Sequence, residues 1–109
     1  INFKKIAIKS DFVMVDRGDL LAEIGDSRLF SSILKISSFL KRKNIPLIIA
    51  TGNLETMQNR DRPSKSEIFT LGFYKHMKFD RIMLSEETAI SKNWLITLKW
   101  LKTFLPRKD

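Results

Sequence analysis

The sequence contains no cysteine and only one histidine, His76, among its 109 residues. Without cysteine there can be no disulfide, no thiol nucleophile and no cysteine-based zinc or iron–sulfur site. No apolar run approaches the roughly 18 residues that a membrane-spanning helix needs, and the N-terminus has no signal-peptide pattern. We therefore expect a cytoplasmic protein without a membrane partner, an organelle interior being the alternative. His76 lies near an expected helix end and fits a helix-terminal or surface residue better than a catalyst.

Glycine and proline are scarce, with four and three residues, whereas 43% of the residues are hydrophobic and 10% are aromatic. This composition is typical of one globular domain with enough apolar material for a core, and not of a disordered chain. The chain begins at Ile1 rather than at methionine, so we expect that processing or truncation has removed an upstream segment.

Positive charge is in excess, with 20 lysine and arginine residues, 12 acidic residues and a net charge of +8. Clustered cations would favour a nucleic-acid partner, because they release counterions from the phosphate backbone. Here the basic residues are spread along the chain, and their longest block is KRK at 41–43. The distribution favours a solvated basic surface, with nucleic-acid binding as the lesser alternative.

Short apolar runs alternate with helical patterns along the chain. The expected elements are strands at 12–15, 47–51 and 81–85 and helices at 27–44, 65–77 and 91–105. Residues 2–9 fit either a short helix or an edge strand. Ser27 is the expected N-cap of the first long helix, and Ser64 with Glu67 has the S-x-x-E pattern of a capping box. This alternation favours right-handed crossovers and a parallel sheet, so we predict the α/β class.

Small or acidic polar residues follow each expected strand: DRGD at 16–19, TGN at 51–53 and SEE at 85–87. In parallel α/β folds, ligands bind at the edge formed by the carboxyl ends of the strands. Each motif alone also fits an ordinary turn or helix cap. Three such motifs in succession favour a functional site at this edge.

Four segments resemble motifs of the pyruvate kinase family, in the same order and with similar spacing. SDFVMVDRGDL at 10–20 resembles S-D-G-I-M-V-A-R-G-D-L, and LIIATGNLETM at 47–57 is similar to P-V-I-x-A-T-Q-M-L-E-S-M. RPSKSE at 62–67 resembles R-P-T-R-A-E, and MLSEETA at 83–89 resembles M-L-S-G-E-T-A. The resemblance implies that residues 1–109 form one domain, a partial TIM (β/α)₈ barrel with about the sixth to eighth strands and their helices.

The resemblance also implies roles for individual residues. Asp19 matches the aspartate that coordinates the divalent metal, and the amides of Gly18 and Asp19 match those that hold the substrate carboxylate. Thr51 matches the threonine beside the enolpyruvate, while Ser85 and Glu87 match the serine and glutamate of the proton-relay region. The implied reaction is the phosphoryl transfer of glycolysis between phosphoenolpyruvate and ADP, giving pyruvate and ATP, with Mg²⁺ and K⁺ as cofactors.

The chain departs from the family pattern around this implied site. Asp16 stands in place of an alanine, Glu86 replaces a glycine, and Gly52 and Asn53 replace a Gln-Met pair. The added carboxylates of Asp16 and Glu86 oppose the binding of an anionic substrate, because like charges repel in a cleft of low dielectric constant.

The chain also lacks most of a catalytic barrel, which needs eight strands in roughly 250 residues. The resemblance places the family's catalytic lysine, its second metal-binding glutamate, its other N-terminal strands and its C-terminal domain outside this chain. We therefore expect the isolated chain to be inactive. Either a longer precursor or a partner chain completes an enzyme, or the chain is a catalytically inactive module with a structural or interaction role. In the second case, self-association or a partner chain is expected to cover its open sheet edges.

Overall fold

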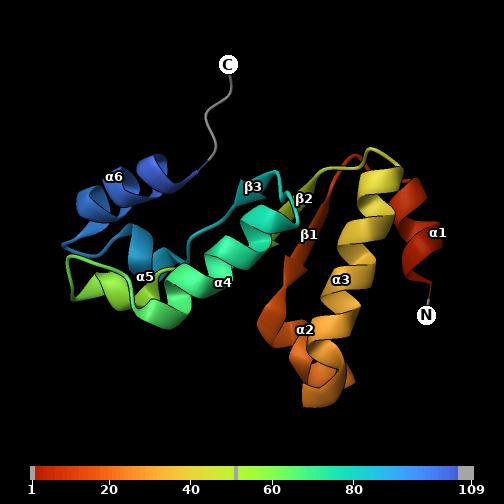
Figure 1. Cartoon of the computed structure of the whole chain (residues 1–109), viewed down its shortest axis with the longest axis horizontal. Helices are drawn as coiled ribbons and strands as arrows, with labels where there is room; N and C mark the ends of the chain where they lie inside the picture. Colours follow the sequence, from red (N-terminus) through yellow and green to blue (C-terminus); the bar gives the residue numbers. More distant parts are fainter. Residues whose placement is uncertain (1, 51, 106–109) are drawn as a thin grey trace.

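The computed structural model describes residues 2–50 and 52–105. Its centre is a parallel sheet of β1 (Val13–Asp16), β2 (Leu47–Ala50) and β3 (Arg81–Ile82), in that spatial order. Both neighbouring pairs of strands are parallel, and a helix lies in each connection between them (Figure 1). The predicted α/β class with a parallel sheet is therefore confirmed.

Helices surround the sheet and extend beyond both of its edges (Figure 1). They are α1 (Phe3–Ile8), α2 (Arg17–Ile24), α3 (Asp26–Arg42), α4 (Lys65–His76), α5 (Glu86–Ala89) and α6 (Trp94–Phe104), with a 3₁₀ turn, η1 (Glu55–Gln58), after β2. α1, α2 and α3 gather at the β1 side of the molecule, and α5 and α6 lie at the opposite end (Figure 1). None of the helices formed by the described residues combines the length and hydropathy that a bilayer crossing requires.

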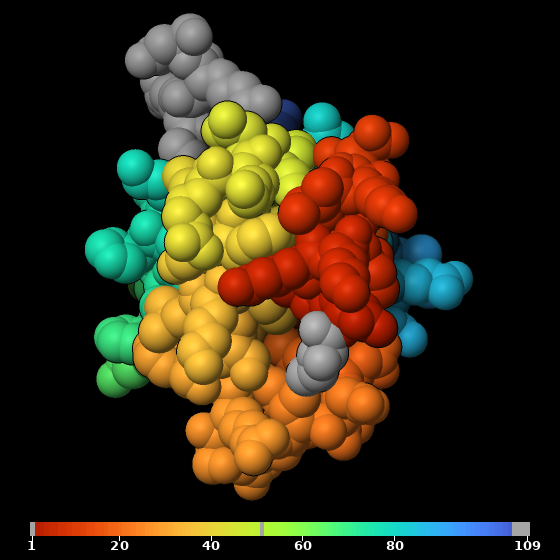
Figure 2. Space-filling view, turned by 90° about the vertical axis from the view of Figure 1, so that its right-hand side faces the viewer, coloured from red at the N-terminus to blue at the C-terminus, as the bar shows by residue number. Residues whose placement is uncertain are grey.

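The segment at 2–9, which the sequence left open, contains a helix and no strand. This helix, α1, lies beside α3 (Figure 2). The ring of Phe3 meets that of Phe39 edge-on, with 5.7 Å between the centroids. Ala7 is fully buried. α1 thus packs with α3 on the β1 side of the molecule and is not an edge strand of the sheet.

The capping box predicted at the start of α4 is confirmed. Ser64 Oγ accepts a hydrogen bond from the Glu67 amide at 3.1 Å, and Glu67 Oε1 accepts one from the Ser64 amide at 2.8 Å. Glu67 Oε2 also accepts from the Thr56 amide at 3.0 Å, so it ties η1 to α4. Burial raises the pKa of Glu67, but the hydrogen bonds from Thr56 and Ser64 outweigh burial and hold the pKa below its ordinary value.

The structure corrects the predicted start of the long helix. Ser27 is not its N-cap, because α3 already begins at Asp26 and Gly25 is the N-cap. Gly25 has a φ of 83°, a left-handed conformation that glycine adopts at little cost. The preceding residues form α2, so the chain turns sharply between two consecutive helices at this glycine.

The strand ends differ from the predicted bounds. β3 contains only Arg81 and Ile82 rather than five residues, because the chain beyond Ile82 turns away towards α5. Thr51, the last residue of the second expected strand, lies outside the described residues. β1 ends at Asp16, which belongs to the strand and also caps the helix that follows it.

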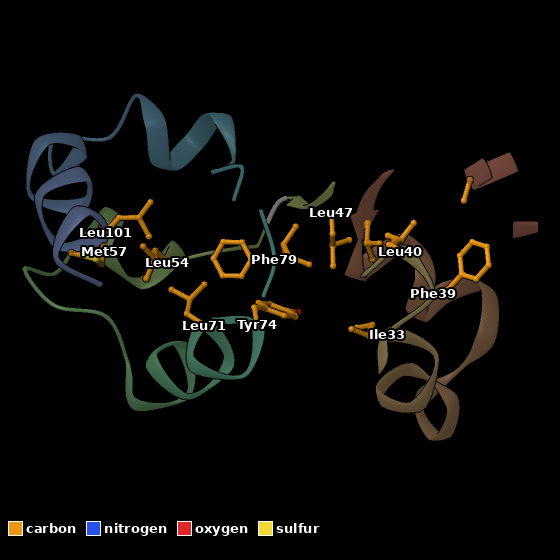
Figure 3. Close-up of a cluster of buried hydrophobic side chains, with 13 residues drawn as sticks. Ile33, Phe39, Leu40, Leu47, Leu54, Met57, Leu71, Tyr74, Phe79 and Leu101 are labelled. Carbon is orange, nitrogen blue, oxygen red and sulfur yellow. The ribbon is translucent and has the colours of Figure 1, made fainter. Parts of the chain in front are cut away.

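The hydrophobic core is continuous from α3 through the sheet and α4 to α6 (Figure 3). Its buried side chains include Ile33, Phe39, Leu40, Leu47, Leu54, Met57, Leu71, Tyr74, Phe79 and Leu101. Large apolar side chains stay exposed at both ends of the molecule. They include Ile6, Ile8, Phe12 and Met14 on the β1 side and Ile90, Trp94 and Leu95 near α6. Both ends therefore offer apolar surface to further protein.

Candidate functional site

The three strands end side by side at one edge of the sheet. The register pairs Asp16 with Ala50 and Ile49 with Ile82, and the Met83 amide donates to the carbonyl oxygen of Ile49 at 2.8 Å. The loops after the strands therefore start from adjacent positions. The sequence predicted a site at this edge, and the fold brings the three predicted loops to it.

Gly18 and Asp19 lie in the first turn of α2, and their amides are occupied by a side chain of the protein itself. Asp16 Oδ1 accepts hydrogen bonds from the Gly18 amide at 3.0 Å and from the Asp19 amide at 3.2 Å. These are the amides that the family resemblance implies as donors to a substrate carboxylate. A ligand carboxylate must therefore displace Asp16 to use both donors. This displacement would cost the stabilisation that an aspartate N-cap gives a helix, about 1 kcal/mol.

The side chain of Asp19 belongs to an exposed residue, and it lines an open cavity of about 420 Å³ together with Asp16 and Glu23. Within residues 2–50 and 52–105, no three His, Cys, Asp or Glu side chains are grouped so that they could hold a metal ion. His76 is exposed in the last turn of α4. Mg²⁺ takes about six oxygen ligands, so Asp19, which the family resemblance implies as a metal ligand, would need further ligands to hold the ion.

Arg17, the first residue of α2, reaches across to the loop after β2. Its Nη2 donates to the carbonyl oxygen of Gly52 at 2.8 Å and to Asn53 Oδ1 at 3.2 Å. The guanidinium carbon lies 5.3 Å from the centre of the Tyr74 ring, within cation–π range. Burial raises the pKa of Tyr74, and the positive charge of Arg17 opposes this rise.

Asn53 links the same loop to the third strand end. Its side chain is only 2% exposed, and Nδ2 donates to the Met83 carbonyl at 3.0 Å and to the Ile49 carbonyl at 3.4 Å. One amide thus contacts Arg17 at the start of α2, Ile49 in β2 and Met83 just after β3. Sequence reasoning noted Asn53 only as a departure from the family pattern and did not connect it with Arg17. The sequence feature that could have indicated its role is a polar amide side chain close to the end of an apolar strand.

Ser85 caps the short helix that follows β3. It is 8% exposed, and Ser85 Oγ accepts from the Thr88 amide at 3.4 Å and lies 3.1 Å from Thr88 Oγ1. Gln58 Nε2 donates to the same threonine oxygen at 3.0 Å. Glu86 and Glu87 are exposed in the first turn of α5, where negative charge suits the positive end of the helix dipole. Ser85 is therefore buried, whereas Glu87 is exposed to solvent.

Comparison with known proteins identifies the family. Residues 1–94 match the family model of the pyruvate kinase barrel domain. The chain is 38% identical over 102 residues to pyruvate kinase from Encephalitozoon cuniculi, covering 94% of this chain and 24% of that protein. It is 37% identical over 108 residues to pyruvate kinase from Borreliella burgdorferi, covering 99% of this chain and 23% of that protein.

Solved structures agree with the sequence matches. Pyruvate kinase from Pyrobaculum aerophilum aligns with a TM-score of 0.84 at 28% identity, over 98% of this chain and 26% of that one. Pyruvate kinase from Cryptosporidium parvum aligns with a TM-score of 0.80 at 25% identity, over 99% of this chain and 26% of that one. The chain spans about a quarter of the length of these relatives, so the predicted partial barrel is confirmed. The chain belongs to the pyruvate kinase family, and its three strands are part of that family's barrel domain.

Proposed function

We propose that the chain supplies part of the phosphoenolpyruvate-binding wall of a pyruvate kinase active site. The observation that carries this proposal is the meeting of three polar loops at the carboxyl edge of a sheet that belongs to the pyruvate kinase barrel. In barrels of this kind, catalytic residues come from the ends of several strands. The completed site transfers a phosphoryl group between phosphoenolpyruvate and ADP and yields pyruvate and ATP.

In this proposal each loop has a separate task. The first contributes the Asp19 carboxylate as one ligand of Mg²⁺ and the Gly18 and Asp19 amides as donors to the substrate carboxylate. Thr51 lies beside the enolpyruvate, and Ser85 and Glu87 belong to the path by which a proton reaches it. The exposed position of Asp19 leaves its carboxylate open to a ligand, and the N-terminal end of α2 suits the binding of an anionic substrate group by the amides.

The other parts of the site come from protein outside this chain. Among the described residues, no three His, Cys, Asp or Glu side chains are grouped as a metal site, and no strand pairs with the outer edges of β1 and β3. A longer precursor or a partner chain therefore supplies the remaining strands, further Mg²⁺ ligands and the groups that bind K⁺ and ADP. We propose that the assembly works in the cytoplasm and that the chain alone has no turnover.

A complementation assay tests the proposal. The chain is mixed with a pyruvate kinase from which the matching segment has been removed, and pyruvate formation from phosphoenolpyruvate and ADP is followed with Mg²⁺ and K⁺. We expect turnover only in the mixture, and we expect Asp19→Ala to abolish it. Asp11→Ala is the matched control, because Asp11 is an exposed carboxylate ahead of β1. A mixture that assembles but turns over equally well with Asp19→Ala would contradict the role of Asp19.

A further inference from the structure

Arg17 and Asn53 form a connection between loops that are distant in the sequence. The two residues are 36 positions apart, yet the guanidinium donates to the amide oxygen of Asn53 at 3.2 Å. The same guanidinium nitrogen donates to the Gly52 carbonyl at 2.8 Å. A hydrogen bond from a charged donor is stronger than a neutral one, so this contact restrains the first residue of α2.

Gly52 makes this close approach possible. Its φ of +65° is left-handed, and a Cβ at this position would lie 3.1 Å from Arg17 Nη2. A larger residue would therefore be strained in its own backbone and would also crowd the guanidinium. Gly52 and Asn53 are the adjacent positions at which the chain departs from the Gln-Met of the family pattern, and both departures meet the same arginine.

Asn53 carries the connection onward to β3. Its amide oxygen faces Arg17, and its amide nitrogen donates to the carbonyl of Met83, two residues before Ser85. The side chain is 98% buried, where an unpaired amide group would be costly. Each end of this amide therefore has a defined partner, one in the helix that follows β1 and the other just after β3.

We propose that Arg17 and Asn53 are positioning residues that hold the three loops of the site in one arrangement. Arg17 is adjacent to Gly18 and lies in the same first helical turn as Asp19, so its anchor on Gly52 and Asn53 sets how α2 leaves β1. The order of Gly18 and Asp19 thus depends on a side chain from the loop after β2. What the ordered loop is used for rests on the proposed function above, but the coupling itself does not.

Amide ¹⁵N relaxation of the full chain tests this coupling without any ligand. Rigid backbone has an order parameter of about 0.85, and flexible backbone lies below about 0.6. We expect Asn53→Leu and Arg17→Met each to lower the order parameters of Gly18 and Asp19 towards the flexible value. The double variant is expected to be no more mobile there than Arg17→Met alone, because Arg17→Met already removes the hydrogen bonds to both Asn53 and Gly52. Asn59→Leu is the matched control, since Asn59 is exposed near the same loop.

Asn53→Asp separates positioning from a general loss of stability. Aspartate keeps an acceptor for Arg17 but loses the donor to Met83, so unfolding free energy falls as in Asn53→Leu while Gly18 and Asp19 stay ordered. Unchanged order at Gly18 and Asp19 in Asn53→Leu, or an equal loss in Asn53→Asp, would overturn the proposal. The relaxation measurement uses no substrate, so it still tests the positioning proposal if the complementation assay fails. Conversely, if the relaxation measurement shows no change in order at Gly18 and Asp19, the positioning proposal is refuted even when the complemented enzyme turns over normally.

Discussion

Asp16 Oδ1 lies 3.0 Å from the amide nitrogen of Gly18, so the last residue of β1 caps the helix that β1 leads into. The chain thereby places one of its own carboxylates on a donor that the proposed function assigns to the carboxylate of phosphoenolpyruvate. Asp16 is one of the departures from the family pattern, and the contact gives that departure a physical meaning. The helix gains a cap, and an incoming anion meets both a competing acceptor and a like charge.

The first prediction concerns Asp16→Ala. Loss of the cap should lower the free energy of unfolding by about 1 kcal/mol. It should also leave the amides of Gly18 and Asp19 open to a small dicarboxylate such as oxalate. Titration with oxalate, followed by amide chemical shifts, should move these two signals in the variant more strongly than in the unmodified chain. Asp11→Ala should change neither property, and equal oxalate shifts with and without Asp16 would contradict the competition.

The second prediction concerns Glu67 and pH. The pKa of Glu67 is held below its ordinary value of 4.5 in the folded chain, so the ionised form stabilises the fold. This contribution is complete above the unfolded pKa and is lost as pH falls through the lower, folded pKa. We expect denaturant unfolding at pH 7 and pH 3 to show a larger stability loss on acidification for the unmodified chain than for Glu67→Gln. Glu55→Gln, at an exposed glutamate, serves as the control, and parallel pH profiles for all three proteins would refute this account.

A comparison of two glycines gives the third prediction. Gly52→Ala meets Arg17 Nη2 at 3.1 Å and requires an alanine at φ +65°, whereas Gly72→Ala meets no heavy atom within 4 Å in the middle of α4. We expect Gly52→Ala to lower the unfolding free energy by about 1–2 kcal/mol. Gly72→Ala should raise it by about 0.5–1 kcal/mol, because alanine favours a helix interior. Urea unfolding measures both, and similar effects at the two sites would show that neither the left-handed backbone at Gly52 nor the contact with Arg17 opposes the alanine.

Features built from neighbouring residues could be predicted from the sequence, and features built from distant ones could not. The capping box joins Ser64 and Glu67, which are three positions apart, so a sequence pattern contains all of it. The contact of Arg17 with Asn53 spans 36 positions and depends on how two strands pair. No local spacing specifies that distance. The resemblance to a family located the loops, but the bond between them follows from residues at which the chain departs from that family.

The helix after β1, α2, could not be predicted from the sequence, because local side-chain patterns do not define it. α2 buries none of its residues, so it lacks the apolar stripe from which a helix is recognised in a sequence. Its start is fixed instead by the Asp16 cap, and its end by the left-handed Gly25. Ser27 has the composition expected of an N-cap, but the turn at Gly25 starts α3 before it. Here backbone geometry outweighed side-chain preference.

Ser85 allows a structural role and a catalytic role to be separated. Its hydroxyl oxygen caps α5 through the Thr88 amide, while the proposed function places it near the proton path to the enolpyruvate. Ser85→Ala removes both roles and should lower the unfolding free energy by about 1 kcal/mol. Ser85→Asn keeps a side-chain acceptor suited to an N-cap but has no hydroxyl. We expect denaturant unfolding to show stability restored in Ser85→Asn, and the complementation assay to show turnover reduced in both variants. Turnover restored together with stability would mean that Ser85 acts only as a helix cap, because then the acceptor oxygen alone is sufficient.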